Sequence, residues 1–139
     1  SSDLTYVINS DTTFAQSDVT VTAVPKLAVV AAEWNNNSIT VHFNRNVDSN
    51  NGGTFDDETD YNFFDAGTKD NSKVSASGVG TKTITFSFTD FNPAVGDTLN
   101  LGSAVRDYDL NGNTLGSLIT LTLEANNRIS LGGTTLPPY

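Results

Sequence analysis

The stretch Ser38–Phe43, with the sequence SITVHF, decides the class of fold. Apolar residues occupy every second position and polar residues occupy the positions between them, so one face of an extended chain is apolar and the other is polar. Residues 81–88 repeat the pattern, with Ile84, Phe86 and Phe88 on the apolar face. Residues 18–23 do the same over a shorter length. Each stretch therefore predicts a half-buried β-strand.

The rest of the chain extends this pattern. Turn-forming runs rich in Asn and Gly separate the segments, and no stretch has a sustained helical period. Several short alternating strands of this kind predict an all-β fold, an antiparallel sandwich of about seven to nine strands. The further strand candidates are residues 27–34, 73–77, 98–105 and 118–123.

Composition agrees with a β fold and narrows the classes of function. Thr, Asn and Ser make up 48 of the 139 residues, and these residues favour strands and turns over helices. The net charge of -9 argues against nucleic acid or an anionic membrane as partner. The chain has no Cys and one His, which excludes thiol chemistry and Cys-based zinc sites. The longest apolar run, residues 27–32, is too short to span a membrane.

The order of the strand and turn motifs resembles a known family. Residues 43–48 read FNRNVD at the end of a strand, and residues 105–113 read VRDYDLNGN near the end of the pattern. Over residues 27–123 this resembles the bacterial Ig-like domains of S-layer and other cell-surface proteins. The second motif has two more residues between Asp107 and Gly112 than the family pattern. The resemblance implies an Ig-like sandwich, an extracellular or cell-surface location, a structural role and no catalytic residues.

The ends of the chain differ from its middle. We expect residues 18–124 to form the sandwich, residues 1–17 to be an N-terminal extension and residues 125–139 to be a C-terminal tail. Within the extension, Leu4, Tyr6 and Ile8 alternate as they would along one face of a strand. This segment is predicted to pair with its own sandwich or, as a donor strand, with a neighbouring copy.

One loop has the spacing of a calcium ligand set. Asp107, Asp109, Asn111 and Asn113 carry oxygens at alternate positions, as in the first half of an EF-hand loop. The position that needs a bidentate Glu is Leu118, so a complete calcium site requires oxygens from elsewhere. The other interpretation is a turn stabilised by the Asp side chains, with Gly112 at positive φ.

A second acidic stretch has two interpretations. Seven acids lie between Asp48 and Asp70 with few basic residues beside them. A second calcium site or glycosidase carboxylates are the functional alternatives, and a solvated acidic loop is the preferred interpretation.

Three other features bear on ligands. His42 is expected at the surface, on the polar face of its strand. Asn36 begins the one glycosylation sequon, Asn-Asn-Ser, so it is the candidate position for an attached glycan. Four aromatic residues are expected to pack in the core or to form a platform for sugar rings: Trp34, Tyr61, Phe63 and Phe64.

Two functions follow from these observations. The first is an extracellular structural subunit that binds copies of itself and forms a filament or surface lattice through its N-terminal strand. The alternative is a monomeric adhesive or carbohydrate-binding module. An enzyme is not expected, because the sequence has no nucleophile, base or metal constellation of adequate specificity.

Overall fold

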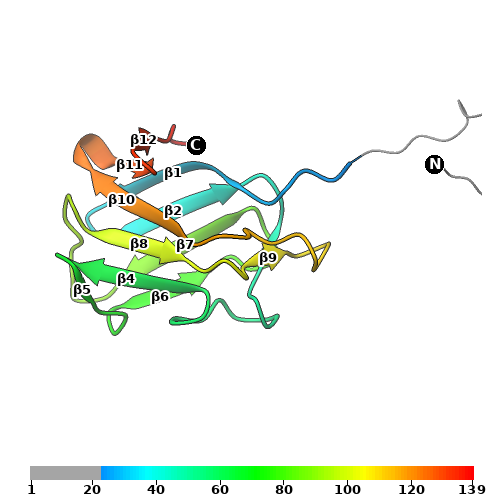
Figure 1. The fold of residues 1–139 in the computed structure, drawn as a ribbon. Coiled ribbons are helices and arrows are strands. Elements are labelled where there is room, and N and C mark those ends of the chain that lie inside the picture. Colours follow the sequence, from blue (N-terminus) through cyan, green and yellow to red (C-terminus); the bar gives the residue numbers. More distant parts are fainter. Residues whose placement is uncertain (1–22) are drawn as a thin grey trace, which may run out of the picture.

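The computed structural model describes residues 23–139, which form a nearly all-β domain (Figure 1). The strands are β1 (Val29–Asn35), β2 (Ser38–Phe43), β3 (Val47–Asp48), β4 (Tyr61–Asp65), β5 (Thr68–Lys69), β6 (Val74–Ser77), β7 (Thr83–Phe88), β8 (Thr98–Leu101), β9 (Arg106–Asp107), β10 (Ile119–Glu124), β11 (Arg128–Leu131) and β12 (Thr134–Thr135). A 3-10 turn, Ala125–Asn127, joins β10 to β11.

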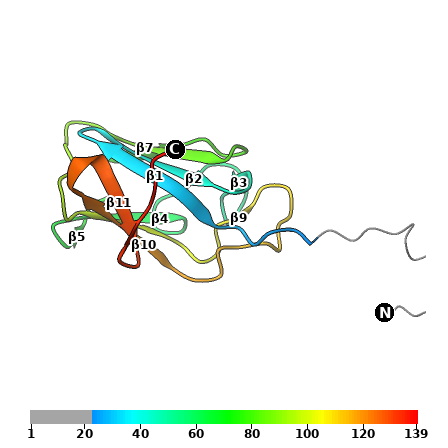
Figure 2. The same cartoon turned by 90° about the horizontal axis from the view of Figure 1, so that it is seen from above.

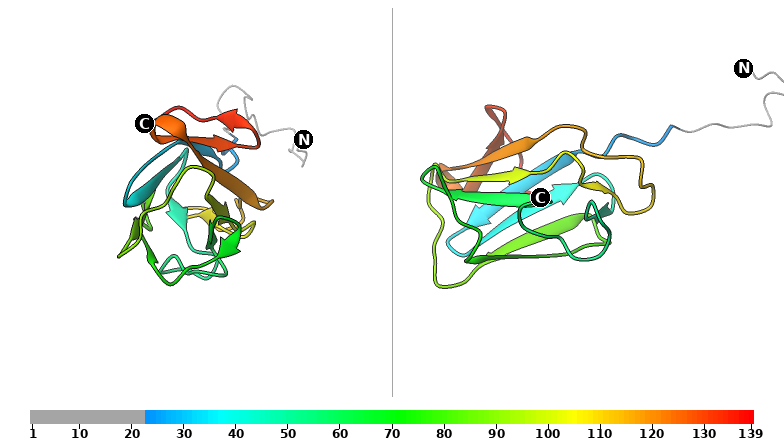
Figure 3. Two further views of the ribbon diagram at one scale, coloured as in Figure 1. Left: turned by 90° about the vertical axis from the view of Figure 1, so that its left-hand side faces the viewer. Right: turned by 60° about the horizontal axis from the view of Figure 1, so that its bottom comes forward.

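Ten of these strands form one antiparallel sheet, in the order β5-β4-β8-β10-β11-β1-β2-β7-β6 with β12 beside β11. The sheet curls into a half-barrel, so that β4, β8 and β10 make one wall and β1, β2 and β7 make the other (Figures 2 and 3). The short strands β3 and β9 form a separate ladder at one end of the molecule (Figure 2). The predicted all-β antiparallel sandwich-like fold is confirmed, with its two walls continuous through β11.

Aromatic side chains join the two walls. Tyr61 on β4 meets Phe86 on β7 with ring centroids 5.1 Å apart, and Phe63 meets Phe88 at 4.8 Å. The alternation seen in the sequence places Ile84, Phe86 and Phe88 inside the core, as predicted. Each such side chain contributes about 1.5–3 kcal/mol by leaving water.

The chain after residue 124 contributes to the sheet, which differs from the expected tail. β11 pairs with β10 over four residue pairs and with β1 at Glu33, so it lies between the two walls. Ile129 on this strand is fully buried. Asn126 and Asn127 adopt positive φ angles of 63° and 62°, a conformation that Asn tolerates well, and they turn the chain back after β10. The sandwich therefore includes residues that the sequence pattern assigns to a tail.

The predicted strand over residues 18–23 and the N-terminal extension lie outside the described residues, apart from Ala23. Within residues 23–139, no helix is long and apolar enough to cross a membrane.

Candidate functional site

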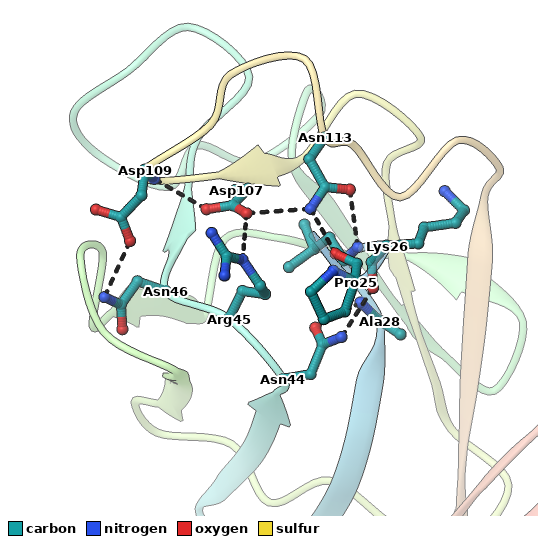
Figure 4. A network of polar contacts seen from close by, with 10 residues as sticks. Pro25, Lys26, Ala28, Asn44, Arg45, Asn46, Asp107, Asp109 and Asn113 are labelled. Atoms are coloured by element: carbon teal, nitrogen blue, oxygen red, sulfur yellow. Dashed lines mark hydrogen bonds and ion pairs between the residues drawn. The ribbon is translucent and has the colours of Figure 1, made fainter. Parts of the chain in front are cut away.

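Asp107 is the centre of a buried polar network at the end of the molecule where the described chain begins (Figure 4). The pairing of β9 with β3 brings Asp107 close to Arg45, which lies two residues before β3. Asp107 Oδ2 accepts hydrogen bonds from Arg45 Nε and, at 3.0 Å, from Asn113 Nδ2. Its Oδ1 accepts one from the backbone N–H of Asp109 at 2.9 Å. Both carboxylate oxygens are thus engaged.

Two asparagine side chains hold the chain segment that enters the sandwich. Asn113 donates to the carbonyl of Pro25 at 2.8 Å and accepts from the N–H of Leu27 at 2.9 Å. Asn44 donates to the carbonyl of Lys26 at 2.8 Å and accepts from the N–H of Ala28 at 2.9 Å. Each side-chain amide therefore bonds to a backbone N–H and a backbone carbonyl, as a neighbouring strand would. The two amides together fix residues 25–28. We call residues 25–28 with Asn44, Asn113, Arg45 and Asp107 the entry clamp.

The Asp107 carboxyl is charged in this setting. Burial raises its pKa, but the hydrogen bonds from Arg45, Asp109 and Asn113 and the charge of Arg45 together outweigh burial. The pKa of Asp107 therefore lies below its ordinary value of 3.8. The charged form stabilises the folded state.

The four residues proposed as calcium ligands do not form one oxygen cage. Asn113 turns its amide nitrogen toward Asp107, and Asp109 Oδ2 accepts from Asn46 Nδ2 at 3.3 Å. Asn111 lies exposed in the turn. Among residues 23–139, no cluster of three or more His, Cys, Asp or Glu side chains is placed to hold a metal. The loop has the hydrogen bonding of the alternative, a turn stabilised by the Asp107 side chain, although Gly112 does not adopt the positive φ expected of it.

We therefore expect calcium to leave the stability of the protein unchanged. Binding at this loop would require the ion to displace Arg45 and Asn113 from Asp107. Thermal melts in excess calcium and in excess chelator should coincide. A higher melting temperature in calcium would show that the ion binds the folded state.

The acidic stretch between Asp48 and Asp70 has two kinds of residue. Asp60 is fully buried and accepts from the backbone N–H groups of Asn50 (2.9 Å) and Asp56 (2.7 Å). Asp48 is buried as well and accepts from the N–H of Ser49 at 2.9 Å. These two carboxylates fix the loop before β4, which corrects the interpretation of the whole stretch as solvated. Burial, then the charges of Asp57 and its acidic neighbours, raise the pKa of Tyr61 on that strand.

His42 differs from the surface residue that its strand face predicts. It lies on the outer face of β2, but only 6% of it is exposed. The ring of Tyr139 stacks on the imidazole with centroids 4.4 Å apart, and Glu33 Oε2 and Thr83 Oγ1 lie 2.9 and 3.1 Å from its two nitrogens. The C-terminal segment covers this face because Pro137 accepts from the N–H of Ala32 on β1.

Three of the four aromatic residues pack in or against the core, as preferred over a sugar platform, whereas Phe64 is half-buried and lies outside the core cluster. Tyr61 and Phe63 are buried in the hydrophobic core. Trp34 is half-buried and donates its Nε1–H to the carbonyl of Glu124 at 2.9 Å. Asn36 lies exposed in the turn between β1 and β2, where a glycan would have access to it.

One edge of the large sheet is closed by the chain itself. At the β4 edge, the N–H of Phe63 donates to Asn71 Oδ1 at 2.8 Å, and its carbonyl accepts from the N–H of Asp70 at 2.9 Å. The carbonyl of Tyr61 accepts from the N–H of Glu58 at 2.8 Å. β5 pairs with the rest of β4. A further strand finds no free main-chain groups along the centre of this edge.

The other edge of the sheet is β6, and it has a different character. β6 pairs only with β7 among residues 23–139. Its sequence, Val-Ser-Ala-Ser, contains no charge, Pro or Gly, the residues with which proteins usually protect an exposed edge. The sequence pattern predicts this strand, but its place at the edge depends on the sheet order.

Leu4, Tyr6 and Ile8, the residues predicted to mediate assembly, lie outside the described residues. Within residues 23–139, the structure shows the unpaired β6 edge and the entry clamp at the start of the described chain. No family model, curated protein or solved structure matches the chain.

Proposed function

We propose that the protein is an extracellular structural subunit that assembles into a filament or surface lattice by donating its N-terminal strand to a neighbouring copy. The observation that carries the proposal is the asymmetry of the sheet edges. The β4 edge is closed by the chain's own residues, and β6 has no partner beyond β7 within residues 23–139. An open sheet edge is a template for an added strand.

The entry clamp supports a role in assembly. A donated strand transmits any pull on the filament to the first residues of the sandwich. Four hydrogen bonds between the side chains of Asn44 and Asn113 and the main chain of residues 25–28 hold the chain at that point. The buried ion pair of Arg45 and Asp107 in turn positions Asn113.

Donor and acceptor surfaces differ in this arrangement, so the contact is heterologous. Such contacts repeat from subunit to subunit and form open fibres instead of closed dimers. The resemblance of residues 27–123 to bacterial Ig-like domains supports a place at the cell surface.

Negative-stain imaging of the intact chain tests this function. We expect polymers from the intact chain and isolated particles from a chain that lacks residues 1–9, because the second chain has no donor strand. Compact monomers of the intact chain whose chemical shifts change on addition of sugars would instead support the carbohydrate-binding alternative.

A further inference from the structure

We propose that the main chain of Ala76, at the centre of β6, accepts residues 4–8 of a second copy. This inference rests on the proposed function and names its acceptor. Three features support it: the main-chain groups that β6 directs away from β7, the side chains beside β6 and the charges at the two sheet edges.

The bonds at the end of β6 show which of its residues direct their main-chain groups toward β7 and which direct them toward the free edge. Thr89 donates its N–H to the carbonyl of Lys73 at 2.9 Å, so these two residues form a hydrogen-bonded pair of the β6–β7 ladder. Such pairs recur at every second residue of an antiparallel ladder. Ser75 and Ser77 therefore direct their main-chain groups toward β7, and Ala76 directs its N–H and C=O away from β7.

The bond on the far side of β7 confirms this arrangement. Phe88 donates its N–H to the carbonyl of Asn37 at 2.9 Å, in line with β2. Phe88 therefore faces β2, and its partner Val74 across the ladder faces the free edge. Val74 uses its N–H in a bond to Asn71, which leaves its carbonyl and both groups of Ala76 for an added strand within the described part of the chain.

The side chains at β6 fit an apolar strand face. Val74 and Ala76 point inward and are half-buried against the core, whereas Ser75 and Ser77 are exposed on the outer face. Val79 and Phe91 are partly buried against the same core. If Leu4, Tyr6 and Ile8 face inward in the added strand, they extend this apolar layer and leave Thr5 and Val7 outside.

Charge favours β6 over the other edge as the acceptor. Residues 1–22 contain Asp3, Asp11 and Asp18 and no basic residue. Lys73, immediately before β6, is exposed and forms no salt bridge within residues 23–139, although its charge helps to lower the pKa of nearby Asp70. The β4 edge lies instead beside acids, and its Lys69 already pairs with Glu58 at 2.7 Å. The acidic extension would therefore meet a lysine without a salt bridge beside β6 and an already paired lysine beside β4.

Fourteen residues separate the proposed donor strand from the described chain. Residues 9–22 separate Ile8 from Ala23, and fourteen extended residues span about 46 Å.

Ala76→Pro tests the acceptor. Proline removes the N–H of residue 76, which the β6–β7 ladder does not use, and edge strands tolerate proline when that group faces outward. The variant should remain folded by circular dichroism, lose its sedimenting polymer, and still bind a chain whose residues 4, 6 and 8 are all serine, because its own donor strand is intact. A folded Ala76→Pro chain that polymerises like the parent overturns the inference.

Cysteine cross-linking provides the second measurement, since the chain has no cysteine of its own. Thr5→Cys chains mixed with Ser75→Cys or Ser77→Cys chains should form an intermolecular disulfide with at least one of the two partners under oxidising conditions. Polymers that form no such link contradict pairing at β6. If a chain lacking residues 1–9 still polymerises, the proposed function itself fails. If that truncated chain stays monomeric but the Ala76→Pro chain polymerises, the proposed function stands and the acceptor is wrong.

Discussion

Replacing Arg45 with alanine should lower the free energy of unfolding by about 3 kcal/mol, because it leaves the buried carboxylate of Asp107 without its cation. Asp107 has no exposed side-chain surface, whereas the Arg45 side chain is 27% exposed, so the lower end of the range for broken buried ion pairs applies. Urea unfolding followed by fluorescence of Trp34 measures the change.

Lys69→Ala provides the matched control. Lys69 and Glu58 form the same kind of ion pair at 2.7 Å, but both side chains are about half exposed, at 45% and 56%. Removing an exposed pair changes stability by about 0.2–1 kcal/mol. Equal losses for the two variants would contradict the role assigned to the entry clamp.

The same ion pair predicts a loss of stability in acid. The pKa of Asp107 is lowered in the folded state, so its contribution is present above the ordinary value of 3.8 that applies in the unfolded chain and is lost as the pH falls through the folded value. In Asp107→Asn, which has no titrating side chain at position 107, the free energy of unfolding should fall less steeply as the pH is lowered. An unchanged acid slope in that variant would show that other carboxyls govern acid unfolding.

Changing Leu4, Tyr6 and Ile8 together to serine should abolish assembly. Each side chain contributes about 1.5–3 kcal/mol when an added strand buries it, so the triple change weakens the subunit contact by at least about a thousandfold. The sandwich itself should remain folded, since residues 23–139 contain the whole described core. Sedimentation and imaging measure the loss of polymer.

The control for this variant is on the opposite face of the same segment. Thr5→Ser with Val7→Thr changes two residues that lie outward in the added strand. Polymer yield should stay close to that of the parent. A loss as large as that of the triple variant would show that the alternation of residues 4–8 is not what the neighbour recognises.

Periodicity alone predicts the strands that have one dry face. β2 spans Ser38–Phe43, the stretch from which the prediction begins, and β7 lies within the predicted 81–88. β4 alternates in the same way, but its short pattern at Tyr61–Phe63 lies among acids whose charges dominate that part of the sequence. β11 is only four residues long and lies between turn residues, although Ile129 and Leu131 do alternate.

The four side chains of the entry clamp lie in the two motifs at residues 43–48 and 105–113, but neither motif shows that these side chains meet residues 25–28. Asn113 bonds to Leu27 across 86 residues, and Asn44 bonds to Ala28 across 16. Nothing local to either asparagine shows that it bonds to the main chain of residues 25–28. The free edge of β6 is likewise a property of the sheet order and not of its four residues.

The length of the polymers as a function of added truncated chain tests strand donation most directly. A chain lacking residues 1–9 keeps its acceptor edge but has nothing to donate, so it binds one end of a growing filament and stops growth there. We predict that mean filament length falls steadily as the mole fraction of truncated chain rises, and that truncated chain alone forms no polymer. Filaments of unchanged length in these mixtures, or polymers of the truncated chain alone, would contradict donation of the N-terminal strand.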